Sequence, residues 1–297
     1  MDRFDSMRLF VRVVDRRSFT AAAADLGLPR STATEAIRHL ESRLGVRLLE
    51  RTTRHVAPTL DGEAYYRRCL SLLGDLEDAE GLFRNVQPRG LLRVDAHGLL
   101  TRAFVLPRLP EFLTQYPLID LFIGQGDRLV DLVREGFDCV LRAGEISDSS
   151  LIVRKLVSLE KVTCASSAYL AEHGVPHSPD DLAGHRMVGF LSSRTQAVVP
   201  MELKVDGQTH HIVLPSRVTV NNSDSMADLG RYGFGLFQGP RYRVKADLES
   251  GVLVEVLKDY QPPPTALSAL YPHSRQLSPR VRVFLDWVAE IFSKANI

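Results

Sequence analysis

The sequence predicts an α/β protein in which a small helical domain precedes a larger domain made of two α/β lobes. Three observations lead to this prediction. Residues 1–58 place apolar residues at helical spacing and interrupt the pattern at one tight corner. Residues 59–85 form one long helical pattern, and from residue 91 onward β-prone and helical segments alternate. The length of 297 residues also indicates more than one compact unit.

The first domain is predicted to open with two helices. Ser18 is typical of the start of the second helix, because its hydroxyl can accept a backbone N–H there, and Gly27 is typical of its end. In residues 1–17 the apolar residues at helical spacing are Phe4, Met7, Phe10, Val11 and Val14. In the second helix the residues expected to be buried are Phe19, Ala22, Ala23 and Leu26.

A third helix is predicted from about Pro29 to Leu44, directly after the corner. Proline is tolerated at its start because the first helical N–H groups lack partners within the helix. The residues expected to face inward are Ala33, Ile37, Leu40 and Leu44. The residues expected to face outward are Arg30, Ser31, Thr34, Glu35 and Arg38.

The segment VRLLERTTRHVAPT is β-prone and predicts a strand pair with Arg51 and Arg54 around its tip. Such a pair is expected for a wing beside a helix-turn-helix. A helix of this kind fits the major groove of B-DNA, and a basic hairpin can contact phosphates or the adjacent groove. The alternative is that the corner belongs to an ordinary small helical domain.

Charge is distributed unevenly along the chain, although the net charge is only +1. Residues 1–60 contain 11 Arg, no Lys and 7 Asp or Glu, which gives +4. Residues 61–90 give −2, and the remainder gives −1. A basic front module on a nearly neutral body indicates contact with a polyanion.

A long helix is predicted from Thr59 to about Asn85, with Thr59 as its N-cap and Asp61 and Glu63 in its first turn. Apolar residues along it are spaced as heptads, which favours pairing with a second copy of the helix. The alternative is packing against the rest of the same chain. We refer to these residues as the heptad seam: Tyr65, Cys69, Leu72, Leu76, Ala79 and Phe83.

Strand and helix patterns alternate after the linker segment RNVQPRG, which predicts a mostly parallel sheet with covering helices. A second set of elements begins near Val162, and a last strand and a closing helix complete the chain. We therefore expect a DNA-binding domain in residues 1–58, a linker and dimerisation helix with a hinge in residues 59–90, and a two-lobed α/β domain in residues 91–297. Lobe I comprises residues 91–161 and 267–297, and lobe II comprises residues 162–266.

The three cysteines, Cys69, Cys139 and Cys164, fit neither a disulfide framework nor a metal-binding spacing. We expect buried thiols, with a redox link between Cys139 and Cys164 as the alternative. The sequence contains neither a signal-peptide pattern nor an apolar run long enough for a membrane helix. A cytoplasmic location is therefore expected, and no membrane, metal or cofactor.

Four segments carry a resemblance to a known family: SFTAAAADLGLPRSTATEAIRHLESRLGVRLLERTTR, PTLDGEAYY, YGFGLFQGPRY and LYPHSRQLSPRVRVFLDW. In these, and over essentially its full length, the chain resembles the LysR-type transcriptional regulators. The resemblance implies a winged helix-turn-helix, a dimerising linker helix and a two-lobed effector domain like the periplasmic binding proteins of type 2. It also implies homodimers usually paired into tetramers, which control promoters through a small effector.

The resemblance places the helix-turn-helix at residues 18–37, with some departures from the family pattern. Pro29 stands where a capping Ser or Thr is common, and Pro58 and Leu60 alter the start of the linker helix. Glu35 is expected to face a neighbouring Arg rather than to accept from a cytosine. The expected DNA-binding residues are Ser18, Arg30, Ser31, Thr34, Arg38, Arg51 and Arg54.

An effector is expected between the lobes, at strand ends and helix N-termini, where free N–H groups attract anions. His97 and Arg142 favour a small organic effector with a carboxylate. The residues expected to line this cleft are His97, Thr101, Gln125, Arg142, Phe190, Asn222 and Phe237.

Two other functions were weighed against gene regulation. An enzyme on the lobed domain is disfavoured because GxSxG, HExxH and P-loop patterns are missing, and no catalytic residue is expected. A solute carrier without gene control would explain the lobes but not the 90 residues ahead of them.

Overall fold

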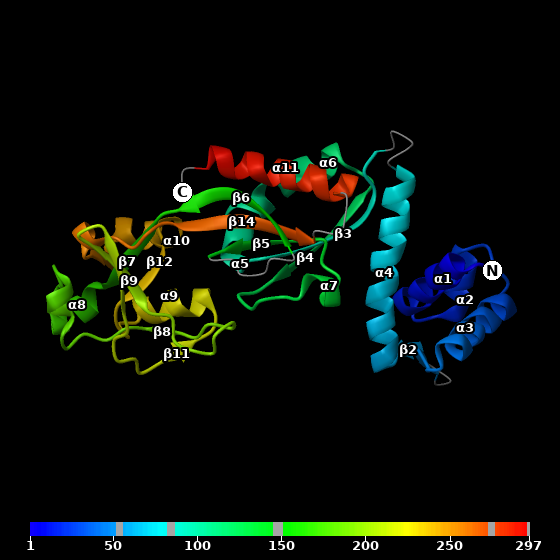
Figure 1. Ribbon diagram of the computed structural model, residues 1–297, viewed down its shortest axis with the longest axis horizontal. Helices are drawn as coiled ribbons and strands as arrows, with labels where there is room; N and C mark the ends of the chain where they lie inside the picture. The colour runs from blue at the N-terminus through cyan, green and yellow to red at the C-terminus, as the bar shows by residue number, and fades with distance from the viewer. Residues whose placement is uncertain (52–55, 82–86, 145–150, 273–276, 296–297) are drawn as a thin grey trace.

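The computed structural model describes residues 1–51, 56–81, 87–144, 151–272 and 277–295. The molecule is elongated, with a helical domain at one end and two lobes extending away from it (Figure 1). A long helix, α4 (Leu60–Gly81), stands between the helical domain and lobe I.

The helical domain is a three-helix unit with a short antiparallel strand pair. Ser18 caps α2 as predicted, with its hydroxyl accepting the Ala21 N–H at 3.2 Å, and Gly45 ends α3 in a left-handed conformation. Three aliphatic and aromatic residues, Leu9, Phe10 and Val13, are fully buried in its core. Its elements are α1 (Arg3–Arg16), α2 (Phe19–Asp25), α3 (Arg30–Leu44), β1 (Leu49–Arg51) and β2 (Val56–Pro58).

Three residues predicted to be buried in this domain are exposed. Phe4 lies in the first turn of α1, Leu26 lies just past the end of α2, and Leu44 is the last residue of α3. Helix ends extend past the core, so the helical spacing of an apolar residue there does not ensure burial. The fully buried positions Leu9 and Val13 were not predicted.

Helix α4 begins where the sequence predicted. The Thr59 hydroxyl accepts the Gly62 N–H at 2.9 Å and donates to the Arg47 carbonyl at 2.7 Å. The helix passes very close to the strand pair: a β-carbon on Gly62 would stand 1.9 Å from the Leu48 carbonyl oxygen. The wing and the first turn of α4 are therefore in direct contact.

Lobe I is a five-stranded mixed sheet in the order β4-β3-β5-β14-β6. Strand β3 is parallel to β4 and β5, whereas β14 runs antiparallel to β5 and β6, so the sheet is less parallel than predicted. Helices α6 and α11 cover one face (Figure 1) and pack Phe112, Phe284 and Trp287 into the core. The bounds are β3 (Gly90–Ala96), β4 (Ile119–Gln125), β5 (Cys139–Ala143), β6 (Leu151–Leu159), β14 (Thr265–Pro272), α6 (Leu109–Gln115) and α11 (Pro279–Lys294).

Two helices predicted in lobe I are shorter than expected. Pro107 and Pro110 interrupt the pattern of residues 101–116, because proline removes a backbone donor and crowds the preceding turn. The segment divides into α5 (Gly98–Leu100), a π-helical turn η1 (Thr101–Val105), η2 (Leu106–Arg108) and α6. The second helix, α7 (Leu132–Glu135), has only four residues between the cap Asp131 and Gly136.

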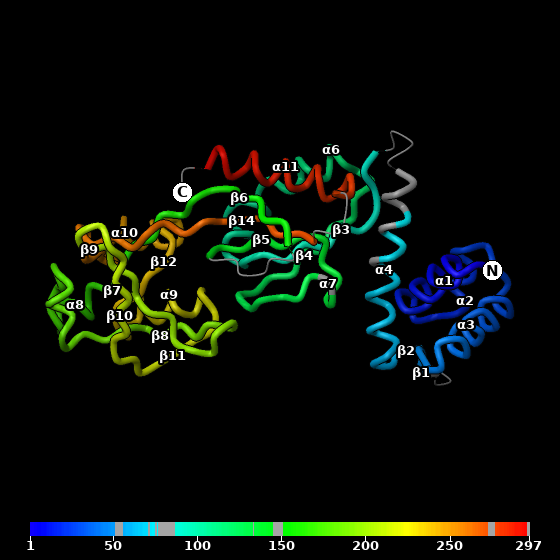
Figure 2. Tube along the Cα trace, in the orientation of Figure 1, coloured from blue at the N-terminus to red at the C-terminus, as the bar shows by residue number. Residues whose placement is uncertain are grey.

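Lobe II contains a three-stranded antiparallel sheet, β12-β7-β13, a hairpin of β9 and β10, and a short parallel pair of β8 and β11. Strands β6 and β14 run side by side from lobe I toward lobe II (Figure 2). The strands are β7 (Lys161–Ser166), β8 (Gly189–Phe190), β9 (Met201–Val205), β10 (Gln208–Ile212), β11 (Thr219–Val220), β12 (Phe237–Pro240) and β13 (Leu253–Val256). The helical segments are α8 (Ser167–His173), η3 (Pro179–Leu182), α9 (Ser223–Arg231), α10 (Arg241–Ser250) and η4 (Lys258–Tyr260).

Candidate functional site: an exposed helix and an interlobe cluster

The outer face of α3 presents basic and polar side chains to solvent. Arg30, Ser31 and Arg38 are exposed, and neither arginine forms an ion pair with the described residues. Pro29 precedes the helix, and no side chain caps its amino end. The first N–H groups of α3 therefore point outward beside Arg30, an arrangement that favours an anion.

The other predicted DNA-binding residues either form hydrogen bonds within the chain or lie outside the described residues. The Thr34 hydroxyl donates to the Arg30 carbonyl at 2.9 Å, and Ser18 is engaged as the cap of α2. The Arg51 side chain and all of Arg54 lie outside the described residues. Glu35 is exposed, and the ion pair predicted for it with an arginine is not formed within the described part of the chain.

The heptad seam divides into residues that face the same chain and residues that remain accessible. Cys69 is fully buried in the core of the helical domain, and the Tyr65 ring lies 5.5 Å from the Phe10 ring. The prediction that Cys69 forms a dimer contact is therefore wrong, because the core of its own domain covers it, whereas Tyr65 is only partly buried and its predicted dimer contact stays a prediction. Leu72 is 44% exposed and Leu76 is partly exposed.

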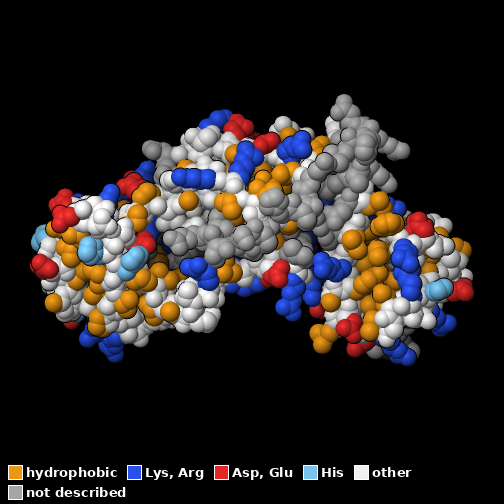
Figure 3. Space-filling view, viewed as in Figure 1, with side chains coloured by type: hydrophobic (Ala, Val, Ile, Leu, Met, Phe, Trp, Pro, Cys, Tyr) orange, Lys and Arg blue, Asp and Glu red, His pale blue; other side chains and the backbone are white. Residues whose placement is uncertain are grey.

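Hydrophobic side chains gather along the lower part of α4 and on the adjoining helices in the space-filling view (Figure 3). Leu60, at the start of α4, is 87% exposed. The Ala79 side chain and Phe83 lie outside the described residues. The accessible apolar residues of α4 therefore include Leu60 and Leu72.

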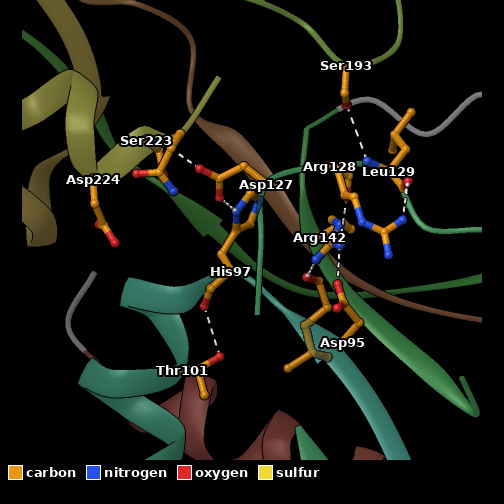
Figure 4. Close-up of polar contacts among 12 residues, drawn as sticks. Asp95, His97, Thr101, Asp127, Arg128, Leu129, Arg142, Ser193, Ser223 and Asp224 are labelled. Atoms are coloured by element: carbon orange, nitrogen blue, oxygen red, sulfur yellow. Dashed lines mark hydrogen bonds and ion pairs between the residues drawn. The ribbon is translucent and has the colours of Figure 1, made fainter. Parts of the chain in front are cut away.

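Asp127 is the central residue between the two lobes (Figure 4). It follows β4 in lobe I, and its side chain is only 4% exposed. One carboxylate oxygen lies 2.6 Å from His97 Nδ1, and the other accepts the backbone N–H of Ser223 at the start of α9 in lobe II. Burial alone would raise the pKa of Asp127, but the bonds from His97 and Ser223 lower it to about 2.

Asp224, the next residue of α9, is bound from both lobes. Arg102 of lobe I donates to its Oδ2 at 2.7 Å, and Arg243 of lobe II donates to its Oδ1 at 2.6 Å. Close by, the Phe104 ring of lobe I packs edge-on against the Tyr242 ring of lobe II at 5.1 Å. Arg102 and Phe104 both belong to the π-helical turn, which thus faces lobe II.

Asp95 and Arg142 form a buried ion pair behind the Asp127 loop (Figure 4). The Arg142 guanidinium also donates to the Arg128 carbonyl at 3.0 Å. Each side chain of the pair is 7% exposed. The pair therefore holds the segment after Asp127 in place from within lobe I.

Two family descriptions match the chain, one in its N-terminal part and one in its C-terminal part. Residues 4–63 match the family description "Bacterial regulatory helix-turn-helix protein, lysR family", and residues 85–293 match "LysR substrate binding domain". The chain belongs to the LysR family of transcriptional regulators. It accordingly has a DNA-binding domain and an effector-binding domain, and neither the enzyme nor the isolated solute carrier remains as an alternative.

LysR relatives align with nearly the whole chain. The uncharacterized regulator YhjC of Escherichia coli is 37% identical to this chain, and the alignment covers 99% of each of the two sequences. A transcriptional repressor of Pseudomonas aeruginosa is 36% identical over 99% of this chain and 93% of its own length. The structure of CrgA, a LysR-type regulator from Neisseria meningitidis, superposes with a TM-score of 0.61 at 31% identity, covering 98% of this chain and 99% of that one.

In this LysR effector domain, three of the predicted cleft residues do not face a cleft. Phe237 is 1% exposed within the core of lobe II, and Thr101 is fully buried with its hydroxyl donating to the His97 carbonyl. Arg142 is already paired with Asp95, so the prediction that it is free to bind an effector is corrected. All three side chains are buried within their own lobe.

The remaining predicted residues lie near the interlobe cluster or at strand ends. His97 bonds to Asp127, and Gln125 is exposed at the end of β4. Asn222 caps α9 by accepting the Ser225 N–H at 3.0 Å, and Phe190 is partly exposed on β8. Five residues of the interlobe cluster were not predicted from the sequence: Arg102, Asp127, Ser223, Asp224 and Arg243.

Within the described residues, no three His, Cys, Asp or Glu side chains are placed to hold a metal ion together. Each helix of this part of the chain is too short or too polar to span a membrane.

Proposed function

We propose that α3 reads duplex DNA through Arg30, Ser31 and Arg38, with Ser18, Thr34, Arg51 and Arg54 in supporting positions. The observation that carries this proposal is the exposed pair of arginines without carboxylate partners among the described residues. An arginine can pair with guanine O6 and N7 or with a phosphate. The uncapped N-terminus of α3 adds a second group that favours a phosphate.

We infer that the chain acts as a homodimer and that two dimers assemble into a tetramer. LysR structures of full length support an oligomeric regulator. On this chain, Leu72 and Leu76 are the part of the heptad seam left accessible for a partner, and Ala79 and Phe83 continue the same spacing. Joining two weak DNA readers raises the local concentration of the second contact.

We infer that a small organic acid binds between the lobes near His97, Gln125, Phe190 and Asn222. Its binding alters the arrangement of the dimers only as far as it favours one lobe arrangement over another. In this proposal residues 1–58 form the DNA-binding domain, residues 59–90 form the linker and dimerisation helix with its hinge, and residues 91–297 form the effector-binding domain. A cytoplasmic location follows from the proposed role, since promoter DNA lies there.

The DNA proposal is tested with the full chain and a fluorescent fragment of its own promoter region. Arg38→Ala should weaken binding by about 1–3 kcal/mol if the arginine makes a bidentate base contact. Arg194→Ala, which removes an exposed arginine of lobe II, is the matched control and should leave binding unchanged. Equal affinities for the wild type and Arg38→Ala would exclude Arg38 from the interface.

The effector proposal is tested by calorimetry with a panel of small carboxylic acids and the matching alcohols. Binding of an acid, but not of its alcohol, supports a carboxylate effector. Binding of alcohols alone would exclude it.

A further inference from the structure

We propose that Asp127 is a latch that holds lobe I against lobe II, and that effector-driven motion of the lobes requires its release from the N-terminus of α9. The link to the effector rests on the function proposed above, whereas the latch itself is a property of the free protein.

The two oxygens of the Asp127 carboxylate contact groups that belong to different lobes. His97 in its own lobe holds one oxygen at 2.6 Å, and the Ser223 N–H of the other lobe binds the second oxygen. Ser223 is the first residue of the nine-residue helix α9, where free N–H groups and the helix dipole favour a negative charge. A carboxylate from lobe I thus occupies the amino end of a lobe II helix.

Three polar contacts that join the lobes differ in their exposure to solvent. The Arg102 side chain in the Arg102–Asp224 pair is 52% exposed, so water and salt screen that pair. The bond from the Leu129 N–H to the Ser193 hydroxyl is also exposed. Asp127 is 4% exposed, so its charged contact is shielded and contributes more to joining the lobes.

Further support is the rigid placement of the loop that carries Asp127. Arg142 donates to the Arg128 carbonyl, and Arg142 is itself fixed by Asp95. Leu129 is bound to Ser193 of lobe II (Figure 4). The loop is therefore held from both lobes directly after Asp127, with the Asp127 side chain placed against the start of α9.

Loss of the carboxylate leaves the Ser223 N–H without its acceptor at a partly buried position. An unpaired group of this kind disfavours the joined state, so the lobes should separate more often. Asp127→Asn keeps the size and one acceptor oxygen but removes the charge, and Asp127→Ala removes both. The expected order of lobe opening is Asp127→Ala, then Asp127→Asn, then the wild type.

The experiment uses the full chain without effector or DNA. Hydrogen exchange followed by mass spectrometry reports the amides at the start of α9. Because a bond to a charged group is lost, exchange there should rise about tenfold or more in Asp127→Ala. The matched control is Asp286→Asn, which removes an exposed lobe I carboxylate paired with Arg154 at 2.7 Å; exchange at α9 should not change.

Lobe separation is measured directly by electron spin resonance. Spin labels are attached to Thr114→Cys in lobe I and Glu172→Cys in lobe II, both exposed positions. The three native cysteines are buried, so the labels attach to the introduced thiols. A longer second distance should appear when Asp127 is replaced.

Unchanged exchange at α9 and an unchanged distance distribution in both Asp127 variants would overturn the latch. If the lobes separate but promoter binding and its response to bound acid stay as in the wild type, the latch holds and the link to regulation fails. Failure of the wild type to bind promoter DNA would refute the proposed function without affecting the lobe measurement.

Discussion

The guanidinium of Arg280 packs against Gly74 of α4, such that a β-carbon on Gly74 would stand 2.7 Å from Arg280 Nη2. Arg280 is the second residue of α11 in lobe I and also donates to Asp138 at 3.3 Å. The linker helix is therefore in contact with the effector-binding domain of the same chain. Glycine at this point allows that close approach.

Two glycines of α4 should respond differently to replacement by alanine. At Gly74 the crowding atom ends a flexible side chain, and alanine favours helix by about 1 kcal/mol, so Gly74→Ala should change stability little. At Gly62 the crowding atom is the backbone carbonyl of Leu48, so Gly62→Ala should destabilise by about 1–3 kcal/mol. Urea unfolding of the two variants checks this difference, and equal stabilities would contradict the close packing of the wing.

Accessible and buried residues of the heptad seam should respond differently to substitution. Leu72→Glu places a charge on the accessible side of α4 and should lower the mass measured by analytical ultracentrifugation while changing stability little. Cys69→Ser buries a hydroxyl in an apolar core and should destabilise by about 1–3 kcal/mol without lowering the mass. If the Cys69→Ser protein dissociates without any loss of stability, Cys69 belongs to the dimer interface after all.

The three thiols should be unreactive in the folded protein. Burial raises the pKa of Cys69 to about 11, that of Cys164 to about 12, and that of Cys139 well above its ordinary value. Cys139 lies in the core of lobe I and Cys164 in the core of lobe II, so they are not placed to form a disulfide. Ellman's reagent should label them only after denaturation, and rapid labelling of the native protein would show that these cores open.

Acid should weaken the contribution of Asp127 to stability. Its pKa is lowered from 3.8 to about 2 in the folded protein, so the contribution is present above pH 4 and is lost as the pH falls toward 2. The shift corresponds to about 2 kcal/mol. Unfolding measured between pH 2 and 7 should show the wild type and Asp127→Asn converging at low pH, and a constant difference would show that the charge is not involved.

The sequence predicted those features that depend on local chemistry. The caps Ser18 and Thr59 and the exposed α3 residues Arg30 and Arg38 follow from side-chain type and helical spacing. Cys69 shows where this reasoning fails, since an apolar face on a long helix can meet either a partner or its own domain, and only the path of the chain decides.

The interlobe cluster could not be derived in full for a related reason. Asp127 and Ser223 are 96 residues apart in the sequence and lie in different lobes. Arg142 carries the charge expected for an acid-binding residue, but its neighbour Asp95 on the adjacent strand already neutralises it. Sequence spacing does not reveal such cross-strand pairs.

Because Tyr65 and Cys69 are packed into the same core as Phe10, the DNA-binding domain and the first half of α4 form one packed unit. A small tilt of lobe I where Arg280 meets Gly74 would swing α3 through a larger arc at the far end.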